Sequence, residues 1–161
     1  MMLDELILYF VDQANGLMTK TQLVMFLYLV DLYAVKWTEK PLTQLDWYYF
    51  NHEPCADGID LALNRLGMEI FQNTQYDFDL VRMSFRYSEM NCFNFSEGLR
   101  LVLENIRKEW TGLTSKRIQE LSQYVHSTAP MIEGESKSSS ESKARLNLKL
   151  ARDQLIQELG L

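Results

Sequence analysis

The stretch from Gln22 to Lys36 constrains the fold most, because it carries almost no polar side chain. Besides the two end residues, only Asp31 within it is polar. Thr19 and Gln22 just before it have the spacing of a capping box, which marks the start of a helix. A helix that is apolar on all sides must be surrounded by other elements. The sequence therefore predicts a central helix over 22–36, with the rest of the domain packed around it.

The other elements are predicted from hydrophobic spacing and from cap and turn residues. Helices are expected over 3–14, 57–66, 96–110 and 114–125, and strands over 42–50, 68–72 and 78–87. The alternation of the last strand slips between Leu80 and Val81, which suggests a bulge or a later start. This order of elements predicts a helix-dominated α+β fold, a single domain with a small three-stranded antiparallel sheet.

The composition changes at Gly134. Residues 134–143 contain five serines and no apolar side chain, which is typical of a flexible linker. We expect it to separate a domain of residues 1–133 from a C-terminal amphipathic helix within 144–161, whose apolar stripe is formed by Leu148, Ala151, Leu155 and Leu159. A helix of this length needs a surface to lie on. Its own domain, a partner or a second copy could supply that surface; the polar linker favours a partner. A chain without residues 136–161 is accordingly expected to fold but to bind its partner weakly.

Charge and cysteine content limit the classes of function. The net charge is −6, and residues 1–95 carry 6 basic and 13 acidic side chains. Nucleic-acid binding depends on a basic face that neutralises phosphates, so this balance makes nucleic acid an unlikely partner and favours a basic protein. Two cysteines provide no disulfide framework, and no signal peptide or bilayer-spanning run is recognisable. A cytoplasmic protein is expected.

No catalytic constellation stands out. His52 and Cys55 are close in sequence, but a zinc site needs about four ligands, and the other two candidates, His126 and Cys92, are isolated. A Cys–His nucleophile pair would need an orienting third group. Phosphate-binding glycine loops and zinc-protease motifs are missing from the sequence. The sequence therefore predicts no metal, no cofactor and no enzymatic activity.

Asp31 is expected to have a structural role, because a buried carboxylate in an apolar helix needs hydrogen-bond donors. Trp47, Tyr48 and Tyr49 alternate along their predicted strand, so at least one of them is expected at the surface, where Trp and Tyr favour protein interfaces. A sheet packed on both faces would instead bury all three. Both alternatives remain open from the sequence.

A series of short motifs follows the central helix. Leu27-Tyr28-Leu29-x-Asp31 is followed by Lys40-Pro41-Leu42-Thr43, then by a turn with Pro54, a short helix that ends with Leu63-Asn64-Arg65-Leu66, and finally His126 with Pro130-Met131. Over roughly residues 3–135, this order resembles the Panacea or SocA-like antitoxin domain, a family that also includes phage-associated proteins. The family usually has Gly where Glu53 stands, and glycine tolerates a positive φ, so the turn is expected to differ here.

The resemblance implies an antitoxin of a bacterial toxin–antitoxin pair, which silences its cognate toxin by direct protein binding. In one branch of the family the antitoxin is an adaptor that delivers the toxin to a protease. The expected partner-binding residues are Trp47, Tyr49, His52, Glu53, Pro54, Leu148, Leu155 and Leu159. The expected structural residues are Asp31, His126 and Pro130. A homodimer stays an alternative.

Two other functions compete with this expectation. The order of helices and strands is close to that of a winged-helix DNA-binding regulator. However, the candidate recognition helix over 57–66 carries Asp57, Asp60 and only one basic residue, Arg65, which is the wrong sign for a DNA groove. A phage-encoded inhibitor of a host defence protein, built on the same domain, is not distinguished from an antitoxin by the sequence.

Overall fold

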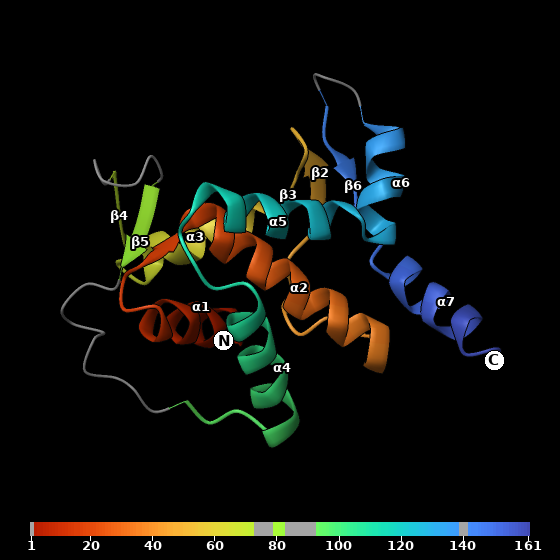
Figure 1. Ribbon diagram of the computed structural model, residues 1–161, viewed down its shortest axis with the longest axis horizontal. Coiled ribbons are helices and arrows are strands. Elements are labelled where there is room, and N and C mark those ends of the chain that lie inside the picture. The colour runs from red at the N-terminus through yellow and green to blue at the C-terminus, as the bar shows by residue number, and fades with distance from the viewer. Residues whose placement is uncertain (1, 73–78, 83–92, 139–141) are drawn as a thin grey trace.

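The structure is a computed structural model that describes residues 2–72, 79–82, 93–138 and 142–161. Within these ranges the chain forms a helix-dominated α+β fold, as the sequence predicts (Figure 1). The helices are α1 (Met2–Gln13), α2 (Lys20–Thr38), α3 (Asp57–Arg65), α4 (Glu97–Glu109), α5 (Ser115–His126), α6 (Ala129–Lys137) and α7 (Lys149–Glu158). The strands are β1 (Met18–Thr19), β2 (Tyr48–Phe50), β3 (Glu53–Cys55), β4 (Glu69–Gln72), β5 (Asp79–Arg82) and β6 (Ala144–Arg145). None of the helices in the described ranges combines the length and the apolar character needed to cross a bilayer.

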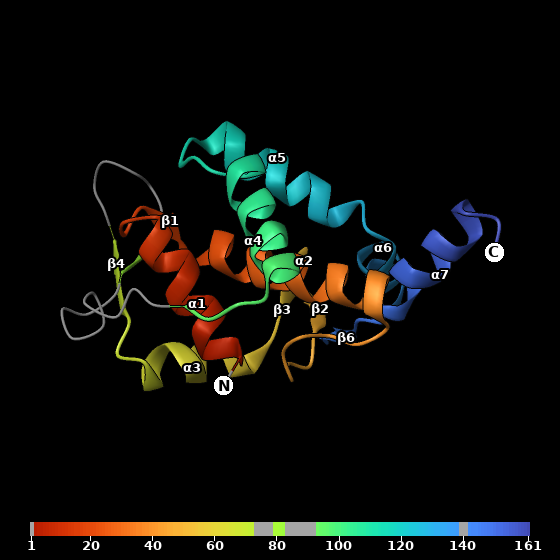
Figure 2. The same cartoon turned by 90° about the horizontal axis from the view of Figure 1, so that it is seen from below.

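Helix α2 is the centre of the fold. The predicted capping box is present: Thr19 Oγ1 accepts a hydrogen bond from the Gln22 backbone N–H at 2.9 Å, and Gln22 Oε1 accepts one from the Thr19 N–H at 3.0 Å. All side chains from Met25 to Leu32 are buried. Helices α1, α4, α5 and α7 contact α2 (Figures 1 and 2). The predicted central helix is therefore confirmed, and it is the element around which the others pack.

The strands form two small antiparallel sheets rather than one. In the first sheet β5 lies between β1 and β4, and in the second β2 lies between β3 and β6. The pairing of β4 with β5 runs without interruption from Asp79 to Arg82, so there is no bulge at Leu80. Leu80 and Val81 are both buried, which shows that both faces of β5 are covered. Two-sided burial explains the slip in the alternation. Residues 78 and 83–87 of the predicted strand lie outside the described residues.

The predicted strand over 42–50 is a strand only at its end, β2. The backbone N–H groups of Leu42 and Thr43 donate to the Asp31 carboxylate. These residues therefore form a loop that is bonded to a side chain, and they do not pair with another strand. After β2 the chain reverses at Asn51 and His52, which have φ values of 53° and 68°. Two consecutive positive φ values are typical of a type I′ hairpin turn. The strained positions are therefore these two, and Glu53 begins strand β3.

The C-terminal segment packs on the rest of the chain. Helix α6 occupies 129–137, so the expected flexible linker is wrong over residues 134–137, and residues 139–141 lie outside the described residues. Strand β6 pairs with β2, and α7 contacts α2 and α6. The C-terminal helix begins at Lys149 instead of Ala144. The sequence leaves three possible surfaces for the C-terminal helix: its own domain, a partner or a second copy. In the structure the helix packs on its own domain.

Gly134 lies where α6 packs closely against Tyr49 of the second sheet and against Leu146. A Cβ atom there would lie 2.7 Å from Leu146 Cδ2 and 2.9 Å from Tyr49 Cβ. Gly134→Ala is expected to destabilise the fold by about 1–2 kcal/mol, because overpacking outweighs the better helix propensity of alanine. Gly98→Ala in α4, where a Cβ meets nothing within 4 Å, is the matched control and is expected to stabilise by up to about 1 kcal/mol. Urea unfolding measures the change in unfolding free energy for both variants. Equal effects of Gly134→Ala and Gly98→Ala would contradict the close packing of Gly134 against Leu146 and Tyr49.

Candidate functional site

Asp31 lies fully buried in the middle of α2. Its Oδ1 atom accepts hydrogen bonds from the backbone N–H groups of Leu42 and Thr43, at 2.9 Å each. Its Oδ2 atom accepts one from Trp47 Nε1 at 2.9 Å and another from the Thr43 hydroxyl. Hydrogen bonds to an ionised carboxylate are strong, so Asp31 fixes the loop that follows α2. The donors that a carboxylate needs in an apolar helix are thus supplied mainly by this loop.

Three of the expected partner-binding residues are inside the protein. Trp47 and Tyr49 are each only 3% exposed, and Pro54 is buried as well. Their burial leaves them unavailable for contact with a partner in this structure; for Tyr49 it follows because β2 is the central strand of its sheet and α6 packs against it. Tyr48, whose side chain alternates with theirs, is half-exposed. Trp47 instead packs edge-on against Tyr28, with ring centroids 5.5 Å apart.

The turn between β2 and β3 brings both histidines together. The Nδ1 atom of His52 lies 3.1 Å from the Tyr49 hydroxyl, and His126 Nε2 donates to the carbonyl oxygen of His52 at 2.8 Å. His126 thereby ties the end of α5 to the hairpin, and the buried Pro130 follows in the first turn of α6. His52 and Glu53 are exposed. The sequence places these residues on separate elements and contains no local signal for the contact.

Cys55 does not pair with His52 in the way a nucleophile would. It lies near Lys143 and Asp57, and burial raises the pKa of its thiol. In the part of the chain that the structure describes, no group of three or more His, Cys, Asp or Glu side chains is placed to hold a metal ion. Cys92 lies outside that part.

The expected leucines of the C-terminal helix are only partly available. Leu148 and Leu155 are half-buried, and Leu148 packs against the core, whereas Leu159 is exposed at the end of α7. In Figure 1 the end of α7 points away from the β2–β3 hairpin. The exposed members of the expected set therefore lie apart, with His52 and Glu53 at the β2–β3 hairpin and Leu159 at the end of α7.

A groove of about 500 Å³ lies between α2, α4 and α5. This volume falls within the range of ordinary ligand pockets. The groove is lined by Tyr33, Trp37, Val102, Asn105, Ile106, Glu109, Trp110 and Tyr124. Four of these eight residues are aromatic, and Trp37 is 63% exposed. We refer to these eight residues as the aromatic groove.

The aromatic groove follows from helical spacing on three helices. Tyr33 and Trp37 are one turn apart on α2, and Ile106 and Trp110 are one turn apart at the end of α4, which crosses α2 beside α5 (Figure 2). The Trp110 and Tyr124 rings pack at 5.1 Å between centroids. The hydroxyls of Tyr33 and Tyr124 are 2.7 Å apart and share a hydrogen bond. These contacts hold the rings of Tyr33, Trp110 and Tyr124 against one another.

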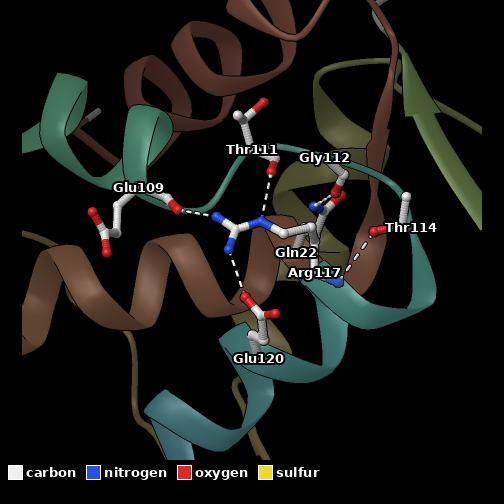
Figure 3. A network of polar contacts seen from close by, with 7 residues as sticks. All are labelled: Gln22, Glu109, Thr111, Gly112, Thr114, Arg117 and Glu120. Atoms are coloured by element: carbon white, nitrogen blue, oxygen red, sulfur yellow. Dashed lines mark hydrogen bonds and ion pairs between the residues drawn. The ribbon is translucent and has the colours of Figure 1, made fainter.

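A polar network holds α4 and α5 in place around the groove (Figure 3). The Arg117 guanidinium donates to the carbonyl oxygens of Glu109 and Thr111 at the end of α4, and it pairs with the Glu120 carboxylate at 2.6 Å. It also lies over the Trp110 ring, 5.7 Å from the centroid.

The same connection is tied to the start of α2 by Gln22, which donates to the Gly112 carbonyl oxygen at 2.7 Å. The capping-box residue Gln22 therefore serves two purposes, since its Oε1 atom caps α2 and its Nε2 atom fixes the loop between α4 and α5. The groove walls are thus held by contacts between α2, α4, α5 and the loop that joins α4 to α5.

Glu109 is the charged residue that lines the groove. Its carboxylate has no hydrogen bond or ion pair with any residue in the described ranges, although its carbonyl oxygen accepts from Arg117. Burial, the hydrogen bond with Tyr124 and the negative charge of Glu109 together raise the pKa of Tyr33. The negative charge among the lining residues is that of Glu109.

Sequence reasoning missed this groove. Tyr33 belongs to the predicted central helix, whereas Trp110 and Tyr124 belong to two other predicted helices, over 96–110 and 114–125. Nothing in the local spacing brings the three rings together. The signal that could have found it is the continuation of the aromatic spacing from Tyr33 to Trp37, beyond the apolar run. No family model, curated protein or solved structure matches this chain, so the groove has to be interpreted from its own residues.

Proposed function

We propose that this chain is an antitoxin-type binding protein that acts in the cytoplasm by contact with a toxin protein and not by catalysis. The observation that carries the proposal is the aromatic groove, which presents Trp37 and Tyr124 at the surface. Tryptophan and tyrosine supply much of the binding energy at protein interfaces. The acidic first part of the chain and the order of motifs around the central helix support the same function.

Given the structure, we expect the partner to bind at a different surface from the one that the sequence suggests. Trp47, Tyr49 and Pro54 are buried, and the tail is packed against α2 and α6. The aromatic groove offers preformed, exposed aromatic rings in their place. We therefore assign the partner-binding role to Trp37 and Tyr124 instead of Trp47, Tyr49 and Pro54.

A DNA-binding role has less support. Arg65, the basic residue of α3, pairs with Asp4, and Asp60 on the same helix pairs with Lys20. The helix therefore offers a DNA backbone no free positive charge among its own described side chains. Sequence-specific DNA binding by this chain at ~150 mM salt would contradict the proposal.

Co-expression with the product of the neighbouring gene tests the proposed function. We expect the neighbour's product to arrest growth when it is expressed alone, and this chain to restore growth and to co-purify with it. Trp37→Ala is expected to weaken the complex about tenfold or more, because a central aromatic anchor is lost. Leu101→Ala is the matched control, since Leu101 is 58% exposed on α4 but does not line the groove.

A neighbour that is harmless alone and does not co-purify would refute the antitoxin function. If the toxin's level also falls when this chain is present, and a protease is required for that fall, the chain is an adaptor. If the chain is carried by a phage and binds a host protein instead of its neighbour, it is an inhibitor of that host protein.

A further inference from the structure

The aromatic groove combines two features that favour a positive charge. Its rings come from Tyr33, Trp37, Trp110 and Tyr124. The faces of such rings attract ammonium and guanidinium groups, most strongly in tryptophan. The protein already uses this contact at the edge of the groove, where the Arg117 guanidinium lies over Trp110. A second cation would find the rings that Arg117 does not cover.

The second feature is the carboxylate of Glu109. No basic side chain lines the groove, and no cation in the described part of the chain pairs with Glu109. An anionic ligand would be repelled by this charge. A purely apolar ligand would remove water from the carboxylate without replacing its hydrogen bonds, which is costly. A cation with an apolar stem avoids both penalties, since the stem packs on the rings while the charge meets Glu109.

We propose that the aromatic groove receives an arginine or lysine side chain of the partner protein, with Glu109 as its counter-ion. The inference rests on the proposed function, because it names the partner chemistry for that same groove. A protein side chain fits better than a free small cation, since the groove is open and Trp37 stands exposed at its surface. The net charge of −6 also attracts a basic protein over longer distances.

Titration of the full chain with blocked amino acids tests the inference without the partner. The probes are the N-acetyl amides of arginine, lysine and norleucine, which differ in charge while their stems are similar. Binding is followed by the indole N–H signals of Trp37 and Trp110 in nuclear magnetic resonance spectra. We expect the two cationic probes to shift these signals and to bind about tenfold more tightly than norleucine.

Matched variants of α4 test the role of the charge. Glu109→Gln keeps the shape and is expected to weaken arginine binding about three- to tenfold, because a charge-assisted contact is lost. Glu104→Gln changes the charge equally, on the same helix but outside the groove, and is expected to leave binding unchanged. Equal binding of norleucine and arginine, or no effect of Glu109→Gln, would overturn the inference. Tight binding of tetramethylammonium without binding of the arginine probe would overturn it too, because the groove would then serve a free small cation.

The same variants in the toxin complex separate the two proposals. Loss of affinity on both Trp37→Ala and Glu109→Gln supports the inference. If Trp37→Ala weakens the complex and Glu109→Gln does not, the binding function stands. The inference that the groove receives a basic side chain of the partner then fails. If the arginine probe binds as expected but no toxin is found, the antitoxin function fails while the cation preference of the groove stands.

Discussion

Replacing Asp31 with alanine is expected to destabilise the protein by about 3–5 kcal/mol, the usual loss when one partner of a buried charged network is removed. The change leaves the backbone N–H groups of Leu42 and Thr43 and the indole N–H of Trp47 without their acceptor. Each buried donor without a partner costs about 1–3 kcal/mol. The fall in the melting temperature should be roughly 6–20 °C for a chain of this size. Thermal unfolding followed by circular dichroism measures it.

Two milder variants and a control resolve the origin of this loss. Asp31→Asn keeps the acceptor for the two backbone donors but turns an NH₂ group toward Trp47 Nε1, so its effect should be intermediate. Trp47→Phe removes only the indole donor and should cost less than Asp31→Ala. Asp153→Ala removes an exposed carboxylate of α7 and should change stability by no more than about 0.5 kcal/mol. An Asp31→Ala effect as small as that of Asp153→Ala would show that the loop does not depend on the carboxylate.

The sequence predicts elements whose signals are local. The helix caps are an example, because each of their hydrogen bonds joins residues that are only three apart in the sequence. These caps are the capping box of Thr19 and Gln22 and the caps at Ser96 and Thr114. The need of Asp31 for donors also follows from its surroundings in one helix. These features were predicted because the residues that decide them are neighbours in the chain.

The elements that were missed depend on distant partners. The loop over 41–47 replaces the expected strand because its amides bond to Asp31, eleven and twelve residues away. Helix α6 has a Ser-rich end typical of a linker, yet Gly134 is buried against Tyr49 and Leu146. The aromatic groove likewise exists only after three helices have packed together. Contacts between residues far apart in the sequence cannot be predicted from composition or from hydrophobic spacing.

Strand β6 makes the tail part of the second sheet, and this reverses the sequence-based expectation for a shortened chain. Its residues pair with Tyr48 and Tyr49, and the next N–H, that of Leu146, donates to the Trp47 carbonyl oxygen at 2.9 Å. Ala144 and Leu146 are buried, and so is Ala151 of α7. The tail also closes the end of α2, where Arg152 donates to the Lys36 carbonyl oxygen at 3.0 Å and pairs with Glu39.

Removing residues 139–161 is therefore expected to lower stability by about 5 kcal/mol or more, from lost apolar burial and lost hydrogen bonds. Because an ordinary domain is stable by only about 5–15 kcal/mol, the shortened chain should unfold at low urea or without a cooperative transition. Leu146→Ala in the full chain is a graded version of the same test and should cost about 2–4 kcal/mol. Removing only Gly160 and Leu161, which are exposed, should change little. A chain without residues 139–161 that unfolds cooperatively at the full-length midpoint would show that the tail is energetically separate, and Leu148, Leu155 and Leu159 would again be candidates for contact with the proposed partner.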